Sequence, residues 1–173
     1  MQRAFVFVLG LGLLVVGSAE VGAADAKVAN SPNGIHFPTG YQNWRIIGVS
    51  HRTDKPSLRA ILGNDVAVAA ARSGKTNPWP DGAILGKIVW KEQIHKNWPG
   101  AVVPKEFVHA EFMFKDAKKY ASTGGWGWAR WLGTEQKPFG KDANLAQECI
   151  ACHTPVKGND LVFTHPAVLP AVK

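Results

Sequence analysis

Phe107-Val108-His109-Ala110-Glu111-Phe112-Met113-Phe114-Lys115 alternates between two sets of side chains, as a strand does when its two faces meet different surroundings. One face is apolar throughout: Val108, Ala110, Phe112 and Phe114. The other places an acid and an imidazole between apolar neighbours: Phe107, His109, Glu111 and Met113. The first face indicates core. The second indicates either a solvated sheet face or the lining of a polar pocket.

Two segments flanking this strand also have strand character. Residues 83–91 follow a turn at residues 77–82, and residues 126–131 alternate tryptophans with smaller residues after a Gly-Gly break. The tryptophans are typical either of ordinary core or of the wall of a large flat pocket. Lys87 is a cation between Leu85 and Val89 on a mostly apolar face, and it is either an edge-strand lysine whose ammonium reaches water or a site residue.

Helices are expected to be few and short. The pattern predicts a helical turn leading into a strand at residues 41–50, a strand at 58–62 and a helix at 66–73 with Asn64 and Gly74 as caps. Asp116 is expected to cap a short helix through residue 120, and residues 142–153 form a last helix that Pro155 ends. The sequence therefore predicts an α+β fold with a mainly antiparallel sheet and a few short helices.

The last predicted helix carries Cys149-Ile150-Ala151-Cys152-His153. Two thiols on one helical turn can each bond a vinyl group of one haem, and the adjacent imidazole can then ligate the iron, so this C-x-x-C-H motif predicts a single covalent haem c. A disulfide or a thioredoxin-like pair is a less specific interpretation. A zinc site would need further ligands, and the chain has only these two cysteines.

The N-terminus predicts export. A basic start, an apolar run at residues 4–16 and small residues near 21–26 are typical of a signal peptide over residues 1–26, with an uncleaved anchor as the alternative. Residues 27–173 then form one domain without a further membrane span, in a bacterial periplasm. The formal net charge of +7 favours acidic electron-transfer partners or anions. The lysines are scattered, which argues against nucleic acid.

The remaining axial ligand of a haem held by His153 decides its chemistry. After Met1, only Met113 offers a thioether, and its place between two phenylalanines indicates core. Bis-histidine ligation would draw on histidines that stand in no diagnostic spacing: His36, His51, His95, His109 and His165. An open sixth position, which binds small molecules, is therefore favoured.

Several segments, in this order, resemble the cytochrome P-460 family over nearly all of residues 27–173: Tyr41-Gln42-Asn43-Trp44-Arg45, residues 76–82 leading into Lys87, residues 107–112, Gly124-Gly125-Trp126-Gly127, the C-x-x-C-H motif, and Asp160-x-Val162-Phe163-Thr164. The resemblance implies periplasmic, usually dimeric haem proteins with a mainly antiparallel β fold. In that family a lysine is cross-linked to a meso carbon of the haem, and the characterised enzymes oxidise hydroxylamine to nitrous oxide or nitric oxide.

Carried onto this sequence, the resemblance makes Lys87 the cross-linking lysine, with Lys91 and Lys75 as fallbacks. Glu111 is the expected catalytic proton acceptor, because burial can raise the pKa of a carboxyl toward the working pH. Arg130 is expected either to pair with a haem propionate or Glu111, or to lie at the surface. Ala129 places a small side chain where a second acid could have stood.

The resulting hypothesis is a haem-dependent hydroxylamine oxidoreductase, a homodimer that passes electrons to an external acceptor such as a small cytochrome. A non-catalytic protein that binds nitric oxide or carbon monoxide, like the β-sheet cytochromes c-prime, is the main alternative. Phe112 and Phe114 would form its apolar cap. A bis-histidine electron carrier is the third possibility.

Overall fold

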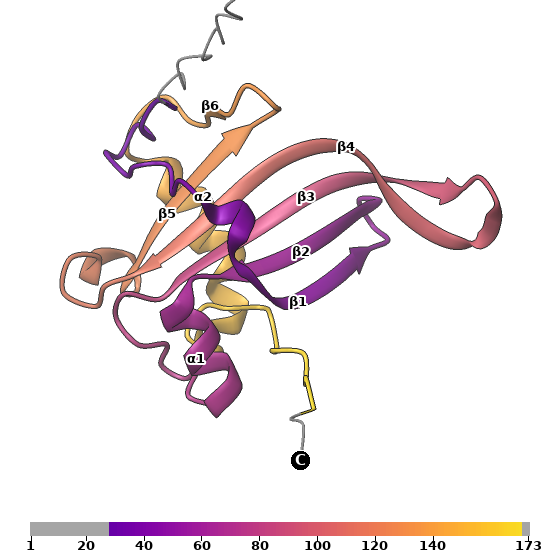
Figure 1. Ribbon diagram of the computed structural model, residues 1–173. Coiled ribbons are helices and arrows are strands. Elements are labelled where there is room, and N and C mark those ends of the chain that lie inside the picture. The colour runs from indigo at the N-terminus through magenta and orange to yellow at the C-terminus, as the bar shows by residue number, and fades with distance from the viewer. Residues whose placement is uncertain (1–27, 171–173) are drawn as a thin grey trace, which may run out of the picture.

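One antiparallel sheet organises the protein, as the computed structural model of residues 28–170 shows (Figure 1). Its six strands follow sequence order from β1 to β6. They are β1 (Arg45–Arg52), β2 (Ser57–Gly63), β3 (Ile84–His95), β4 (Trp98–Lys115), β5 (Trp126–Leu132) and β6 (Lys137–Pro138). Because every strand pairs with its neighbour in sequence, the sheet is built by local connections, and the predicted α+β fold is confirmed.

Two α-helices accompany the sheet: α1 (Asp65–Ser73) between β2 and β3, and α2 (Leu145–His153) near the C-terminus. The predicted caps of the first are confirmed. The Asn64 side chain accepts the Ala67 N–H, and Gly74 ends the helix with a φ of 70°. Short 3-10 helices cover Tyr41–Asn43, Ala121–Thr123 and Thr154–Asn159.

The helix expected at residues 116–120 is wrong. The Asp116 carboxylate accepts the backbone N–H groups of Lys118 and Lys119 at 3.1 and 2.8 Å, as a capping residue would, but the chain makes turns there. Pro155 does not end the helical path either. α2 stops at His153, and Thr154–Asn159 continues as a 3-10 helix with the proline in its first turn, where no N–H is needed.

The hairpin of β3 and β4 is longer than expected, because residues 83–91 and 107–115 are only its inner half. Its outer part pairs Ile94 with Val102 and Glu92 with Pro104, and it projects past the other strands in Figure 1. No element was predicted for residues 92–106, which include Pro104. A two-stranded ribbon tolerates proline because each strand leaves one edge unpaired.

The sheet separates two apolar clusters. On one face, residues 28–44 cover a core cluster comprising Ile35, Tyr41, Ile88, Ala110, Phe112, Ala129 and Trp131. The Phe112 ring meets Phe37, Tyr41 and Trp131 edge-on at centroid distances of 5.8, 5.4 and 5.9 Å. Gly86 lies across from Phe112, and a Cβ there would come within 2.8 Å of the ring. The core face predicted for residues 107–115 is thus this one.

The opposite face packs against the two α-helices, and Figure 1 shows α2 and the N-terminal segment on opposite sides of the sheet. Trp126 is fully buried there, while Trp128 is nearly so. The packing is incomplete beside α2, where a cavity opens. None of the helices between residues 28 and 170 has the length and apolar character that crossing a bilayer requires. The predicted signal peptide lies outside the described residues.

Candidate functional site

A cavity of about 1060 Å³ lies between α2 and the inner halves of strands β2 to β5. All the residues predicted for the site line it: Lys87, Glu111, Cys149, Cys152 and His153. These residues are far apart in sequence. They meet in the cavity because alternate residues of β3, β4 and β5 face α2. The C-terminal half of α2 carries the two cysteines and the histidine.

Both cysteines of the motif are free thiols on α2. Cys149 is partly buried, and burial raises the pKa of its thiol to about 11, against a smaller opposing effect of the Arg130 charge. Cys152 is exposed at the other end of the turn. Neither forms a disulfide, so both sulfurs remain available on the cavity wall.

The imidazole of His153 is held in one orientation. Its Nδ1 lies 2.6 Å from the carbonyl oxygen of Leu161, so Nδ1 carries the proton and Nε2 keeps a free lone pair. Trp128 and Phe163 pack edge-on against the ring at 4.7 and 5.0 Å. Burial lowers the pKa of His153, although the hydrogen bond to Leu161 opposes this effect. A neutral, oriented imidazole is what a metal ligand requires.

Charged side chains gather opposite the motif, on three neighbouring strands. The register places Lys87 of β3 and Arg130 of β5 on either side of Glu111 of β4. The Glu111 carboxylate forms an ion pair with Lys87, lies 2.7 Å from Nε of Arg130 and contacts Nε2 of His109 at 3.2 Å. The second face of residues 107–115 is therefore the lining of a polar pocket rather than a solvated sheet face.

The pKa of Glu111 is lowered, not raised as the sequence analysis expected. Burial alone would raise it, but the hydrogen bond with His109 and the charges of Lys87 and Arg130 together outweigh burial. The raised pKa was expected from burial alone, without the cations on the adjacent strands. Glu111 is therefore a carboxylate stabilised jointly by His109, Lys87 and Arg130.

The donor set fits a c-type haem. Two free thiols and one oriented imidazole share the cavity wall, and the cavity is lined by apolar and cationic groups. Arg59 of β2 adds a second indication, because its buried Nε has no hydrogen-bond partner within residues 28–170. An anionic group such as a haem propionate would satisfy this donor.

The fallback lysines and the possible second axial ligands differ in whether they line the cavity. Lys91 lies at the rim of the cavity and 3.9 Å from Glu106, whereas Lys75 is not among the lining residues. Of the histidines considered for bis-histidine ligation, His109 alone lines the cavity in the described part of the chain, and it contacts Glu111. Met113 also lines the cavity, while packing against the adjoining core.

The apolar residues considered near the haem belong mainly to the opposite face of the sheet. Phe112 and Ala129 border the cavity, yet both are buried in the cluster with Trp131. Phe114 packs against that same cluster. The aromatic cap expected of a gas-binding protein is therefore not formed by Phe112 and Phe114, and an acid at position 129 would be placed in core.

Sequence reasoning missed Arg59 and the packing of Trp128 and Phe163 against His153. Arg59 had a usable signal, since period two in the strand at residues 58–62 groups it with Ile61, which also lines the cavity. The contacts of Trp128 and Phe163 had none, because they depend on how the C-terminal segment returns to the sheet. Arg130 lines the cavity and pairs with Glu111, which was one of the alternatives expected for it.

The family comparison agrees with this geometry. The model of the family described as Cytochrome P460 matches residues 38–164, which include every strand and both α-helices. No match was found among curated proteins. The matched range takes in the C-x-x-C-H motif together with Lys87 and Glu111. The chain is therefore a c-type haem protein that belongs to the cytochrome P460 family.

Proposed function

We propose that this protein oxidises hydroxylamine at a haem held by Cys149, Cys152 and His153, and passes the electrons to an external acceptor. The observation that supports the proposal best is the polar cluster of Glu111, Lys87, Arg130 and His109 on the cavity wall opposite the motif. When bound, the haem supplies a redox-active iron with a coordination position for a small ligand. A gas-binding protein would favour an apolar lining there.

Glu111 is the proposed proton acceptor. Hydroxylamine loses protons as it loses electrons, and a carboxylate in the same cavity can take them. Arg130 and His109 orient the carboxylate from the adjacent strand and from its own strand. Their contacts hold Glu111 toward the cavity and leave it little freedom to turn away.

Lys87 is the proposed cross-linking residue, and its ion pair with Glu111 connects the two roles. An Nζ atom bound to a meso carbon of the haem no longer places an ammonium charge beside the carboxylate. Since that charge is one of the causes that lower the pKa of Glu111, its loss would raise the pKa, while the His109 hydrogen bond and the Arg130 charge would still oppose that rise.

The decisive experiment compares Glu111→Gln with Glu106→Gln, a change to an exposed glutamate on the same strand. Hydroxylamine turnover with an artificial electron acceptor is expected to fall about 100-fold or more in Glu111→Gln, the usual size of a general-base contribution. Glu106→Gln is expected to keep its turnover. Unchanged turnover in Glu111→Gln would remove that residue from the mechanism.

Peptide mass spectrometry tests Lys87 separately. In protein from a host that matures c-type haem, the peptide containing Lys87 is expected to remain attached to the haem peptide of residues 149–153. A haem held only by its two thioethers would favour the gas-binding alternative. A low-spin ferric spectrum that does not change when external ligands are added would favour bis-histidine ligation through His109.

We further propose export to the periplasm, an acidic electron-transfer partner and a homodimer. The net charge of +7 supports the partner, and Arg52, Lys55 and Lys91 lie among the residues lining the cavity. The projecting β3–β4 hairpin supports the homodimer, because Ile94 and Trp98 are 60% and 68% exposed on it. Size-exclusion chromatography with light scattering measures the oligomeric state.

A further inference from the structure

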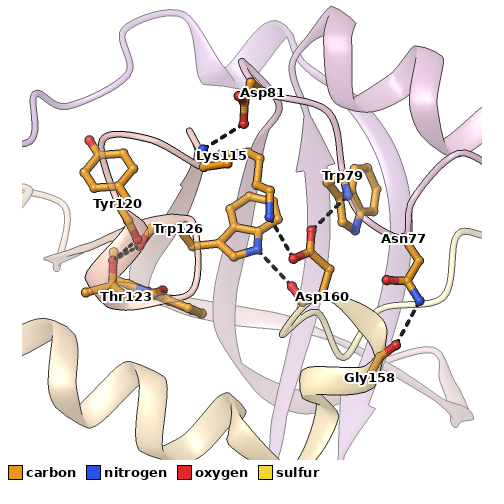
Figure 2. Close-up of polar contacts among 11 residues, drawn as sticks. Asn77, Trp79, Asp81, Lys115, Tyr120, Thr123, Trp126, Gly158 and Asp160 are labelled. Carbon is orange, nitrogen blue, oxygen red and sulfur yellow. Dashed lines mark hydrogen bonds and ion pairs between the residues drawn. The ribbon is translucent and has the colours of Figure 1, made fainter.

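A second lysine–carboxylate pair lies outside the cavity lining, between the end of β4 and the segment that follows α2. Nζ of Lys115 lies 2.7 Å from Oδ1 of Asp160, and the two side chains are only 5% and 11% exposed (Figure 2). The backbone N–H of Trp79 donates to the other carboxylate oxygen at 2.8 Å. The Lys115 ammonium also lies 4.9 Å from the centre of a Trp126 ring.

Asp160 is held in an unfavourable backbone conformation. Asp160 and Leu161 have φ angles of 49° and 62°; aspartate tolerates this left-handed region better than most residues, whereas for leucine it costs about 1–2 kcal/mol. The surrounding contacts compensate for this cost. Nε1 of Trp126 donates to the Asp160 carbonyl at 2.8 Å, and the Asn77 amide donates to the Gly158 carbonyl at 2.8 Å (Figure 2).

This conformation has one consequence for the haem motif. It turns the carbonyl of Leu161 toward α2, where its oxygen lies 2.6 Å from Nδ1 of His153. The acceptor that orients the imidazole is thus the residue directly after Asp160. Val162 and Phe163 then line the cavity, with Phe163 against the His153 ring.

We propose that Lys115 and Asp160 are positioning residues for the axial ligand: their ion pair fixes the Leu161 carbonyl, and through it the orientation and electron donation of His153. A hydrogen bond from Nδ1–H to an acceptor increases the basicity of a ligating imidazole. Neither residue of the pair is in contact with His153. The proposal rests on haem ligation by His153 and not on hydroxylamine as the substrate.

The test uses haem-loaded Asp160→Asn and the double variant Asp160→Ala with Lys115→Met. The double variant leaves no uncompensated buried charge, and the thioethers to Cys149 and Cys152 keep the haem attached in both. We expect the iron–histidine stretching frequency of the ferrous protein to fall and the midpoint potential to rise, because a less basic imidazole stabilises ferric iron less. The larger shift is expected in the double variant.

Val68→Ala is the matched control, since Val68 belongs to α1 and is buried in the apolar cluster that also contains Trp79 and Leu161. It is expected to lower the unfolding temperature without moving the vibration or the potential. The proposal is overturned if both Asp160 variants keep the wild-type vibration and potential. It is equally overturned if Val68→Ala shifts them as much. A wild-type protein that does not turn over hydroxylamine, while the Asp160 variants shift the vibration and the potential, would contradict the proposed function and leave this proposal supported.

Discussion

Two lysine–carboxylate pairs, each with one member on β4, differ in what surrounds them. Lys87 and Glu111 face the cavity with side chains 33% and 19% exposed, whereas Lys115 and Asp160 are 5% and 11% exposed in packed protein. Glu111 is met by side chains of the neighbouring strand and of its own strand. Asp160 is met by a backbone N–H and by the ammonium of Lys115.

The difference teaches that surroundings, not residue types, separate a reactive pair from a positioning pair. Glu111 has several cationic or imidazole partners and lines the cavity, so losing one partner is expected to change its pKa more than it disturbs the packing. Asp160 fixes a strained backbone segment, so losing its partner affects the position of the chain. Four changes test this comparison, from the largest expected effect to the smallest.

Lys115→Met is expected to destabilise most. It leaves the Asp160 carboxylate buried with only the Trp79 N–H, and breaking a buried pair on one side costs about 3–5 kcal/mol. Denaturant unfolding of the haem-loaded protein measures the loss. The double variant with Asp160→Ala should recover part of it, and a cost below about 1 kcal/mol for Lys115→Met would make the two pairs equivalent.

Lys87→Met is expected to cost about 1 kcal/mol or less, because Glu111 keeps Arg130 and His109 and water reaches the pair. Lys87→Arg is the matched control, since it also lacks the amine for a cross-link but retains the cation. The difference in unfolding free energy between these two variants isolates the charge. A difference as large as that of Lys115→Met would contradict the comparison.

The contribution of Glu111 to the free energy of unfolding is expected to depend on pH. Its pKa in the folded protein lies below the ordinary value of 4.5, so its stabilising effect is complete above that value and is lost as pH falls through the folded pKa. The unfolding free energies of the wild type and Glu111→Gln should therefore converge between about pH 5 and about pH 2. A constant difference over that range would show that the pKa is not lowered.

Lys91→Met at the cavity rim is expected to have the smallest effect, within about 0.5 kcal/mol on unfolding, because its contact with Glu106 is exposed. Electron transfer to an acidic acceptor should nevertheless become less sensitive to salt, since one rim cation is lost. Stopped-flow rates at low and high ionic strength measure this. An unchanged salt dependence would remove Lys91 from the docking surface.

Much of the fold was predictable from local patterns. Strict alternation at residues 107–115 gave a strand with the correct core face, and Asn64 and Gly74 gave the ends of α1. The outer half of the hairpin was missed because no element was predicted for residues 92–106, where a two-stranded ribbon accepts proline. The turn after Asp116 was missed because the same side chain can cap a helix or a turn.

Site residues that belong to a short sequence motif were predictable, whereas contacts that depend on the register between strands were less so. The C-x-x-C-H motif predicted the residues that would hold the haem, and Lys87 stood out as a cation on an apolar face. The register that pairs Lys87 with Glu111 and Glu111 with Arg130 was not available, so the pKa of Glu111 was expected to move the wrong way.

The sequence by itself determined the α+β class, the family and the prediction of covalent haem, because each can be read from short local patterns taken in order along the chain. Only the tertiary structure decided which carboxylate meets the cavity charges and which carbonyl orients His153. Both depend on contacts between residues of different elements. Alternation along a strand fixes which face a side chain takes, but not which partners burial will bring to it.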